Sequence, residues 1–179
     1  MRREILRSIE QRASDVIEQL KINALPVPVE RVAELLGLQV TPANLGDEVS
    51  GVLVVQDGTG VIGYNKDQAR VRQRFSIAHE IGHFVLHHDD RKLFIDKATT
   101  VFHRDGNSAT GERRQEVQAN QFAAALLMPR ALVAQEVQSS NYLDDEDMIQ
   151  ELAETFEVSV RAMSLRLVHL GYVEREDDL

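Results

Sequence analysis

The strongest constraint on the fold of this 179-residue chain is a pair of histidines, His79 and His83, which stand four residues apart with Glu80 between them. Residues four apart lie on one face of an α-helix, so both imidazoles can reach a single ion when this segment is helical. Apolar residues recur at three- and four-residue steps across residues 67–88, which is typical of a helix with one buried face. The pattern therefore predicts a helix over 67–88 that carries both histidines on the same side.

The H-E-x-x-H pattern at residues 79–83 combines the residue types that hydrolytic zinc sites use. Two imidazoles bind the ion, and a carboxylate beside them can hold and deprotonate a water molecule. Zinc lowers the pKa of bound water toward 7, which yields a nucleophile for a peptide carbonyl at neutral pH. The motif predicts His79 and His83 as zinc ligands and Glu80 as the catalytic base. A surface helix with two unrelated histidines is the alternative that the motif alone leaves open.

A zinc site of this kind needs a third ligand from the protein. The metzincin arrangement requires Gly at position 86 and His at position 89, and this chain has Leu86 and Asp89 there. His87 shares the helix face with His79, but it lies about 12 Å away along the helix axis, too far for one tetrahedral site. The third ligand must therefore come from another element.

A second predicted helix, over residues 112–128, offers a carboxylate. Glu116 and Asn120 stand four residues apart on one face, so the first could bind zinc while the second holds a histidine ring by its other nitrogen. This is the gluzincin arrangement of two histidines, a glutamate and a supporting polar group one turn later. Glu112, one turn before Glu116, is an equally charged candidate, and either glutamate could instead belong to a solvated helix face.

The remaining sequence predicts an α+β fold. Helices are expected over residues 6–20, 28–36, 129–137, 148–156 and 160–170, and strands over 38–41, 52–55 and 61–64, with two further candidate strands over 93–95 and 100–102. Turn residues at 57–60 indicate a hairpin, and hence a small antiparallel sheet packed on the two helices of the zinc site. We expect one domain of residues 1–179, with an N-terminal helix (1–22), a catalytic core (24–139) and a helix-turn-helix-like end (145–171).

The composition limits the location and the partners. Cysteine is absent, which excludes disulfide scaffolds, thiol nucleophiles and cysteine-ligated zinc, and agrees with a reducing, cytoplasmic location. The N-terminal residues lack the apolar run of a signal peptide, and the longest apolar stretch, 122–129, is too short to span a bilayer. We expect a cytoplasmic protein with no membrane association. With 20 Lys and Arg against 29 Asp and Glu, the net charge is −9, so direct nucleic-acid binding is not expected.

Two separated blocks resemble the two signatures of the ImmA/IrrE family of metallopeptidases. They are RQRFSIAHEIGHFVLH at residues 72–87 and EVQANQFAAALLMP at residues 116–129, and the similarity of layout covers about residues 24–171. The resemblance implies that His79, His83 and Glu116 bind the metal and that Glu80 is the base. Asn120 matches the supporting position, which is often Asp in related gluzincins.

The same resemblance implies an activity and its partners. It implies a cytoplasmic endopeptidase, bacterial or phage-borne, that cleaves a cognate helix-turn-helix repressor encoded nearby and so derepresses stress-response or mobile-element genes. One Zn²⁺ per chain is implied, and a site of two histidines and one carboxylate also accepts Mn²⁺ or Fe²⁺. An edge strand of the small sheet, formed by residues 51–56 or 61–64, is expected to pair with the substrate main chain.

Two functions of other classes are alternatives. In the first, the protein binds its repressor without cutting it, although zinc binding alone would not require Glu80. In the second, residues 145–171 bind DNA, for which Arg161, Arg166 and His169 are the available basic residues.

The group that stabilises the oxyanion of the reaction is not determined by these patterns. A His, Tyr or Arg from another element usually assists the metal in this role. His103, Tyr64 and Tyr142 are unranked candidates.

Overall fold

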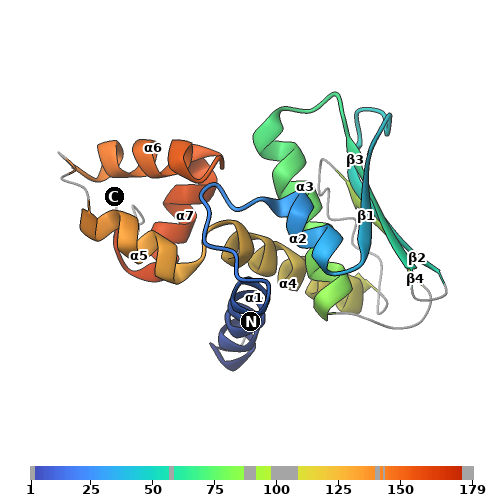
Figure 1. Cartoon of the computed structure of the whole chain (residues 1–179), viewed down its shortest axis with the longest axis horizontal. Coiled ribbons are helices and arrows are strands. Elements are labelled where there is room, and N and C mark those ends of the chain that lie inside the picture. The colour runs from blue at the N-terminus through green and yellow to red at the C-terminus, as the bar shows by residue number, and fades with distance from the viewer. Residues whose placement is uncertain are drawn as a thin grey trace.

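The computed structural model is α+β, with a four-stranded sheet at one end, three helices at the other, and the long helices α3 and α4 between them (Figure 1). It describes residues 3–56, 59–86, 92–97, 109–139, 142 and 144–174. The helices in these residues are α1 (Arg3–Gln19), α2 (Val29–Leu35), α3 (Arg70–Leu86), α4 (Ala109–Leu127), α5 (Arg130–Ser139), α6 (Asp145–Thr155) and α7 (Val160–Leu170). The strands are β1 (Leu38–Ala43), β2 (Val49–Gln56), β3 (Thr59–Asn65) and β4 (Lys92–Lys97). The candidate strand over 100–102 lies outside the described residues.

The sheet is mixed, so the expectation of a purely antiparallel sheet is wrong. The strand order is β1-β3-β2-β4, and β2 runs antiparallel to both β3 and β4, whereas β1 runs parallel to β3. The predicted hairpin of β2 and β3 is present. Because β3 lies between β1 and β2, which run in opposite directions, it must be parallel to one of them. The turn residues at 57–60 predict the pairing of β2 with β3, but they carry no information about where β1 lies.

The strand order also changes which backbone is free to pair. Both β2 and β3 are bonded on two sides, and β1 and β4 form the edges of the sheet in the described residues. The expectation that residues 51–56 or 61–64 provide an edge strand for a substrate is therefore wrong.

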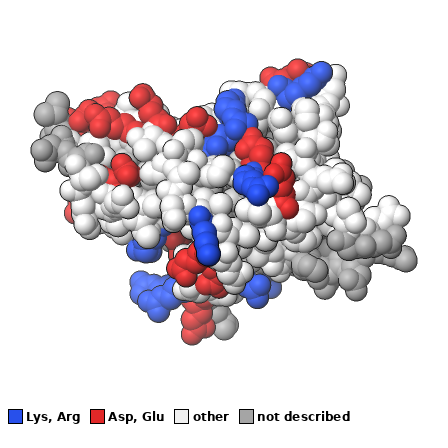
Figure 2. Space-filling view, in the orientation of Figure 1, with Lys and Arg blue, Asp and Glu red and all other residues white. Residues whose placement is uncertain are grey.

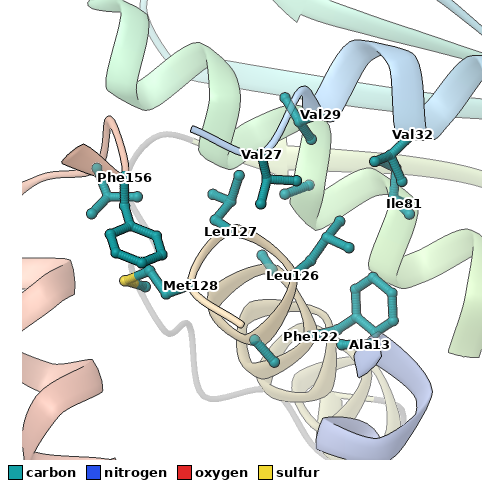
Figure 3. Close-up of a cluster of buried hydrophobic side chains, with 14 of the residues drawn as sticks. Ala13, Val27, Val29, Val32, Ile81, Phe122, Leu126, Leu127, Met128 and Phe156 are labelled. Carbon is teal, nitrogen blue, oxygen red and sulfur yellow. The ribbon is translucent and has the colours of Figure 1, made fainter. Parts of the chain in front are cut away.

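Helix α3 is buried around most of its circumference in its central turns. Residues 76–83 are all buried, because the sheet covers one side of the helix and α4 the other. The core beside it combines Ile81 with Phe122 and Leu126 of α4 and Val32 of α2 (Figure 3). No helix in the described part of the chain is long and apolar enough to cross a membrane.

Two buried arginines connect the C-terminal helices to this core. Arg74 of α3 is 2% exposed and donates to the backbone carbonyls of Val27, Phe156 and Glu157 at 3.0, 3.4 and 3.2 Å. The Arg166 side chain of α7 donates from Nε to the Met128 carbonyl at 3.0 Å and holds a carboxylate of α1. A serine caps α7: the Ser159 hydroxyl accepts a hydrogen bond from the Ala162 backbone N–H.

Candidate metal centre

Three metal-ligating side chains from two helices converge at one point. His79 and His83 project from α3, and Glu116 projects from α4. The two Nε2 atoms of the histidines lie 3.0 Å apart, and the two carboxylate oxygens of Glu116 lie 3.2 Å from His79 Nε2 and from His83 Nε2. The structure therefore brings together the three residues that sequence reasoning singled out as ligands.

The shape of this donor cluster fits a small divalent cation. Nitrogen and oxygen atoms bound at 2.0–2.1 Å to a tetrahedral zinc ion lie about 3.3–3.4 Å from one another. The observed separations of 3.0 and 3.2 Å are close to that spacing. Two imidazoles and a carboxylate also form a donor set that suits zinc, iron or manganese.

The electrostatics of Glu116 favour the ionised form. Burial alone would raise the pKa of its carboxyl, but hydrogen bonds from His79 and His83, together with their positive charge, outweigh burial and lower the pKa to about 2. At neutral pH the group is therefore a carboxylate, which is the form that binds metal.

Glu80 follows His79 on α3, and its side chain lies against strand β2. Its residue is fully buried, and a Cβ atom built on Gly51 would lie 3.1 Å from Glu80 Oε1 and 3.3 Å from the Cβ of Ser76. Gly51 also adjoins an irregularity in the register of β2 with β4. A strand glycine often marks a point where another group approaches the backbone closely. Here the missing side chain leaves the space that the Glu80 carboxylate occupies.

A second glycine sets the spacing of the two helices. Gly82, inside the H-E-x-x-H motif, faces Ala119 of α4, and a Cβ atom at Gly82 would lie 3.1 Å from the Ala119 Cα. The two backbones can approach so closely because the glycine has no side chain. This approach brings Glu116, one turn before Ala119, within reach of both histidines.

Asn120 orients the first histidine. Its Oδ1 atom lies 3.0 Å from His79 Nδ1. An amide oxygen accepts hydrogen bonds and does not donate them, so His79 Nδ1 carries a hydrogen, and Nε2 is the atom that can bind a metal ion once it has lost its own proton. The amide thus makes the contact that a carboxylate would make at this position.

The remaining candidates from the sequence, for a metal ligand or for the oxyanion-stabilising group, are either absent from the described residues or not part of the donor cluster. His87 and His103 lie outside the described residues, as does the side chain of Glu112. Tyr64 of β3 is the direct partner of Gly51 in the β2–β3 register, which puts it on the helix-facing side of the sheet. Tyr142 is partly buried against the core between α5 and α6.

Sequence reasoning did not recognise the roles of Gly51 and Gly82. From the sequence pattern, Gly82 can be placed on the buried face of a helix and Gly51 in a strand, but neither can be assigned a role at the site. A glycine inside a strand pattern is the signal that points to close backbone approach, but it does not identify the approaching group.

The donor cluster thus lies between two helices next to a mixed sheet, with both histidines buried and Glu116 partly exposed. Residues 33–168 match the IrrE N-terminal-like domain (Peptidase_M78), and the chain belongs to this metallopeptidase family. The chain is also similar to a protein of Bacillus phage phi105 named "Uncharacterized immunity region protein 2", with 31% identity over 114 residues. That alignment covers 64% of this chain and 66% of the phage protein, which is just under two thirds of its length.

Proposed function

We propose that this chain is a zinc-dependent endopeptidase whose substrate is a helix-turn-helix repressor. The observation that carries the proposal is the cluster of His79, His83 and Glu116, in a chain of a metallopeptidase family that also carries the buried Glu80 next to His79 on α3. In this proposal the first three side chains hold one Zn²⁺, for which Mn²⁺ or Fe²⁺ can substitute.

Each residue then has a defined part in peptide hydrolysis. The metal, when bound, polarises the scissile carbonyl and acidifies a water molecule. Glu80 accepts a proton from the water that attacks the carbonyl carbon, and delivers it to the nitrogen of the leaving amine as the C–N bond breaks. Asn120 keeps the His79 ring in the tautomer that leaves Nε2 free to bind. Burial of Glu80 keeps its carboxylate in one position for both proton transfers.

The proposed substrate follows from the family and from the phage relative. The name of that phage protein associates it with an immunity region, which supports a transcriptional repressor as the target. A repressor substrate also implies action in the cytoplasm, where derepression of stress-response or mobile-element genes would follow cleavage.

Strand β4 is the better candidate for pairing with the substrate. In the part of the chain that the structure describes it is an edge strand, and it borders β2, against which Glu80 lies. An extended segment of the repressor could add to this edge through main-chain hydrogen bonds.

The structure weakens the DNA-binding alternative for α6 and α7. Arg166, one of its three basic residues, is 4% exposed and is engaged by Met128 and Glu10, so its guanidinium does not face a phosphate backbone. The surface over α6 is acidic, as the red side chains at the upper left of Figure 2 show. Repressor binding without cleavage remains the alternative of a different class.

The test uses the purified repressor encoded next to this protein. It is incubated with the zinc-loaded chain, with the same chain plus a chelator, and with Glu80→Gln, and the products are weighed as intact masses. We expect one cleavage in the first sample only, and zinc retained by Glu80→Gln. Derepression by Glu80→Gln equal to that of the parent would show that binding, not cleavage, is the function.

A further inference from the structure

A concave site lies away from the donor cluster, where α1 meets the start of α5 and the end of α7. Its volume is about 440 Å³, within the usual range for small-molecule sites. It shares no residue with the donor cluster. Its lining consists of Arg3, Leu6, Arg7, Glu10, Gln11, Arg130 and His169.

The lining is unusually basic for a chain with a net charge of −9. Arg3 and Arg7 come from α1, Arg130 is the first residue of α5, and His169 belongs to the last turn of α7. Three guanidinium groups from two helices and one imidazole from a third thus face one cavity. Figure 2 shows basic side chains interspersed with acidic ones around α1, whereas the surface over α6 is mainly acidic.

Glu10 is the carboxylate among the described lining residues, and Arg166, which does not line the cavity, compensates its charge. Both oxygens of Glu10 accept hydrogen bonds from Arg166, at 2.6 and 2.8 Å. Arg166 is 4% exposed and does not line the cavity, so it compensates Glu10 without filling the site. Arg166 makes both hydrogen bonds to Glu10, and the lining residues Arg130 and His169 add only smaller electrostatic contributions, so the cavity carries a net positive charge.

We propose that this cavity, which we call the basic cavity, binds a phosphate group of a small ligand. Guanidinium groups match phosphate oxygens with paired hydrogen bonds, and several of them around one point favour an anion with more than one charge. A phosphate carries between one and two negative charges at neutral pH, whereas a carboxylate carries one. Among the described residues that line it, Leu6 is the only apolar one, so recognition rests on the charged group. The proposal does not depend on the peptidase activity.

The experiment measures binding by calorimetry on the zinc-loaded chain at constant ionic strength, with inorganic phosphate, adenosine monophosphate and adenosine as probes. We expect both phosphate compounds to bind and adenosine not to bind. Similar affinities for inorganic phosphate and adenosine monophosphate would show that free phosphate is enough for binding. Much tighter binding of adenosine monophosphate would show that the phosphate group of a nucleotide is the ligand. Equal binding of all three, or none at millimolar concentration, would overturn the proposal.

Variants with matched charge changes locate the site. Arg7→Gln and Arg130→Gln should each weaken phosphate binding about tenfold or more, because each removes a charge-assisted hydrogen bond. Arg12→Gln on α1 and Arg161→Gln on α7 remove the same charge from exposed positions outside the cavity and should change the affinity less than about twofold. Equal weakening by all four variants would show diffuse attraction only and would refute a site.

If a variant does not fold, an NMR titration of the parent protein still tests where phosphate binds. Phosphate titrated into the isotopically labelled chain should shift the NMR signals of the His169 ring and of the backbone near Arg7. Shifts confined to other parts of the chain would contradict the assignment to the basic cavity.

Discussion

Gly82 of α3 packs against Ala119 of α4 so closely that a Cβ atom at Gly82 would lie 3.1 Å from both the Cα and the carbonyl oxygen of Ala119. Backbone atoms cannot move aside as the end of a flexible side chain can. Any side chain at position 82 must therefore push the two helices apart, and the donors on them separate as well.

Gly82→Ala should weaken zinc binding about tenfold or more, because Glu116 moves away from the two histidines. Competition with a chelating dye measures the affinity. Gly111→Ala is the matched control, since a Cβ there meets nothing within 4 Å and the position lies in α4. The control should keep the parent affinity and gain about 0.5–1 kcal/mol of stability from lower chain entropy. Parent-like zinc binding by Gly82→Ala would contradict this role of the helix contact.

Gly51→Ala should lower the rate of peptide hydrolysis while zinc is retained. The added methyl group would lie 3.1 Å from Glu80 Oε1, so the carboxylate must shift from its present position against β2. A misplaced proton acceptor costs roughly tenfold to a hundredfold in rate. The rate and the bound zinc are measured on the same preparation. A variant that loses zinc in proportion to activity would show that Gly51 supports the metal cluster rather than Glu80.

Asn120→Ala should weaken zinc binding about tenfold to a hundredfold, because His79 loses the acceptor that holds its ring and its tautomer. Asn120→Asp should preserve the affinity or improve it, since a carboxylate accepts the same hydrogen bond. The pair is compared by metal titration. Equal affinity of parent and Asn120→Ala would show that His79 is held by packing alone.

The pair of Glu10 and Arg166 should make stability depend on pH in the acid range. Burial raises the pKa of Glu10, but the hydrogen bond and charge of Arg166, with smaller contributions from Arg130 and His169, bring it below 4.5. Glu10 therefore binds a proton more readily in the unfolded chain than in the folded one. The stabilisation is present above pH 4.5 and is lost as the pH falls through the lower pKa that Glu10 has in the folded chain.

Glu10→Gln should therefore cost about 2 kcal/mol at pH 7 and show a smaller further loss between pH 5 and pH 3 than the parent. Urea unfolding at several pH values measures both quantities. Glu4→Gln, at an exposed position of the same helix, is the control and should follow the parent curve.

Arg74→Met should destabilise the fold by about 3 kcal/mol, because three backbone carbonyls lose their donor inside the protein. Arg70→Met, one turn earlier, removes an exposed pair with Glu30 and should cost less than about 1 kcal/mol. Urea unfolding at neutral pH compares the two variants. Equal losses would mean that Arg74 does not connect α3 to the C-terminal helices as its contacts indicate.

The helices and the donor residues could be predicted from the sequence because their signals are local. The three- and four-residue spacing around His79 predicts α3, and Ser159 predicts the start of α7, since both depend on neighbours within one or two turns. The mixed sheet could not be predicted in this way. Its parallel pair joins β1 to β3, and the choice of neighbour depends on where the whole hairpin packs rather than on any turn residue.

The sequence by itself determined which side chains are available for a metal and that two of them share a helix face. Only the tertiary structure decided that Glu116 meets them, because that distance depends on how closely Gly82 allows α4 to approach. The same holds for Glu80, whose space is left by Gly51 on a strand 29 residues earlier. Periodicity records which face of an element is buried, whereas contacts between elements depend on residues far apart in the chain, and only packing brings those together.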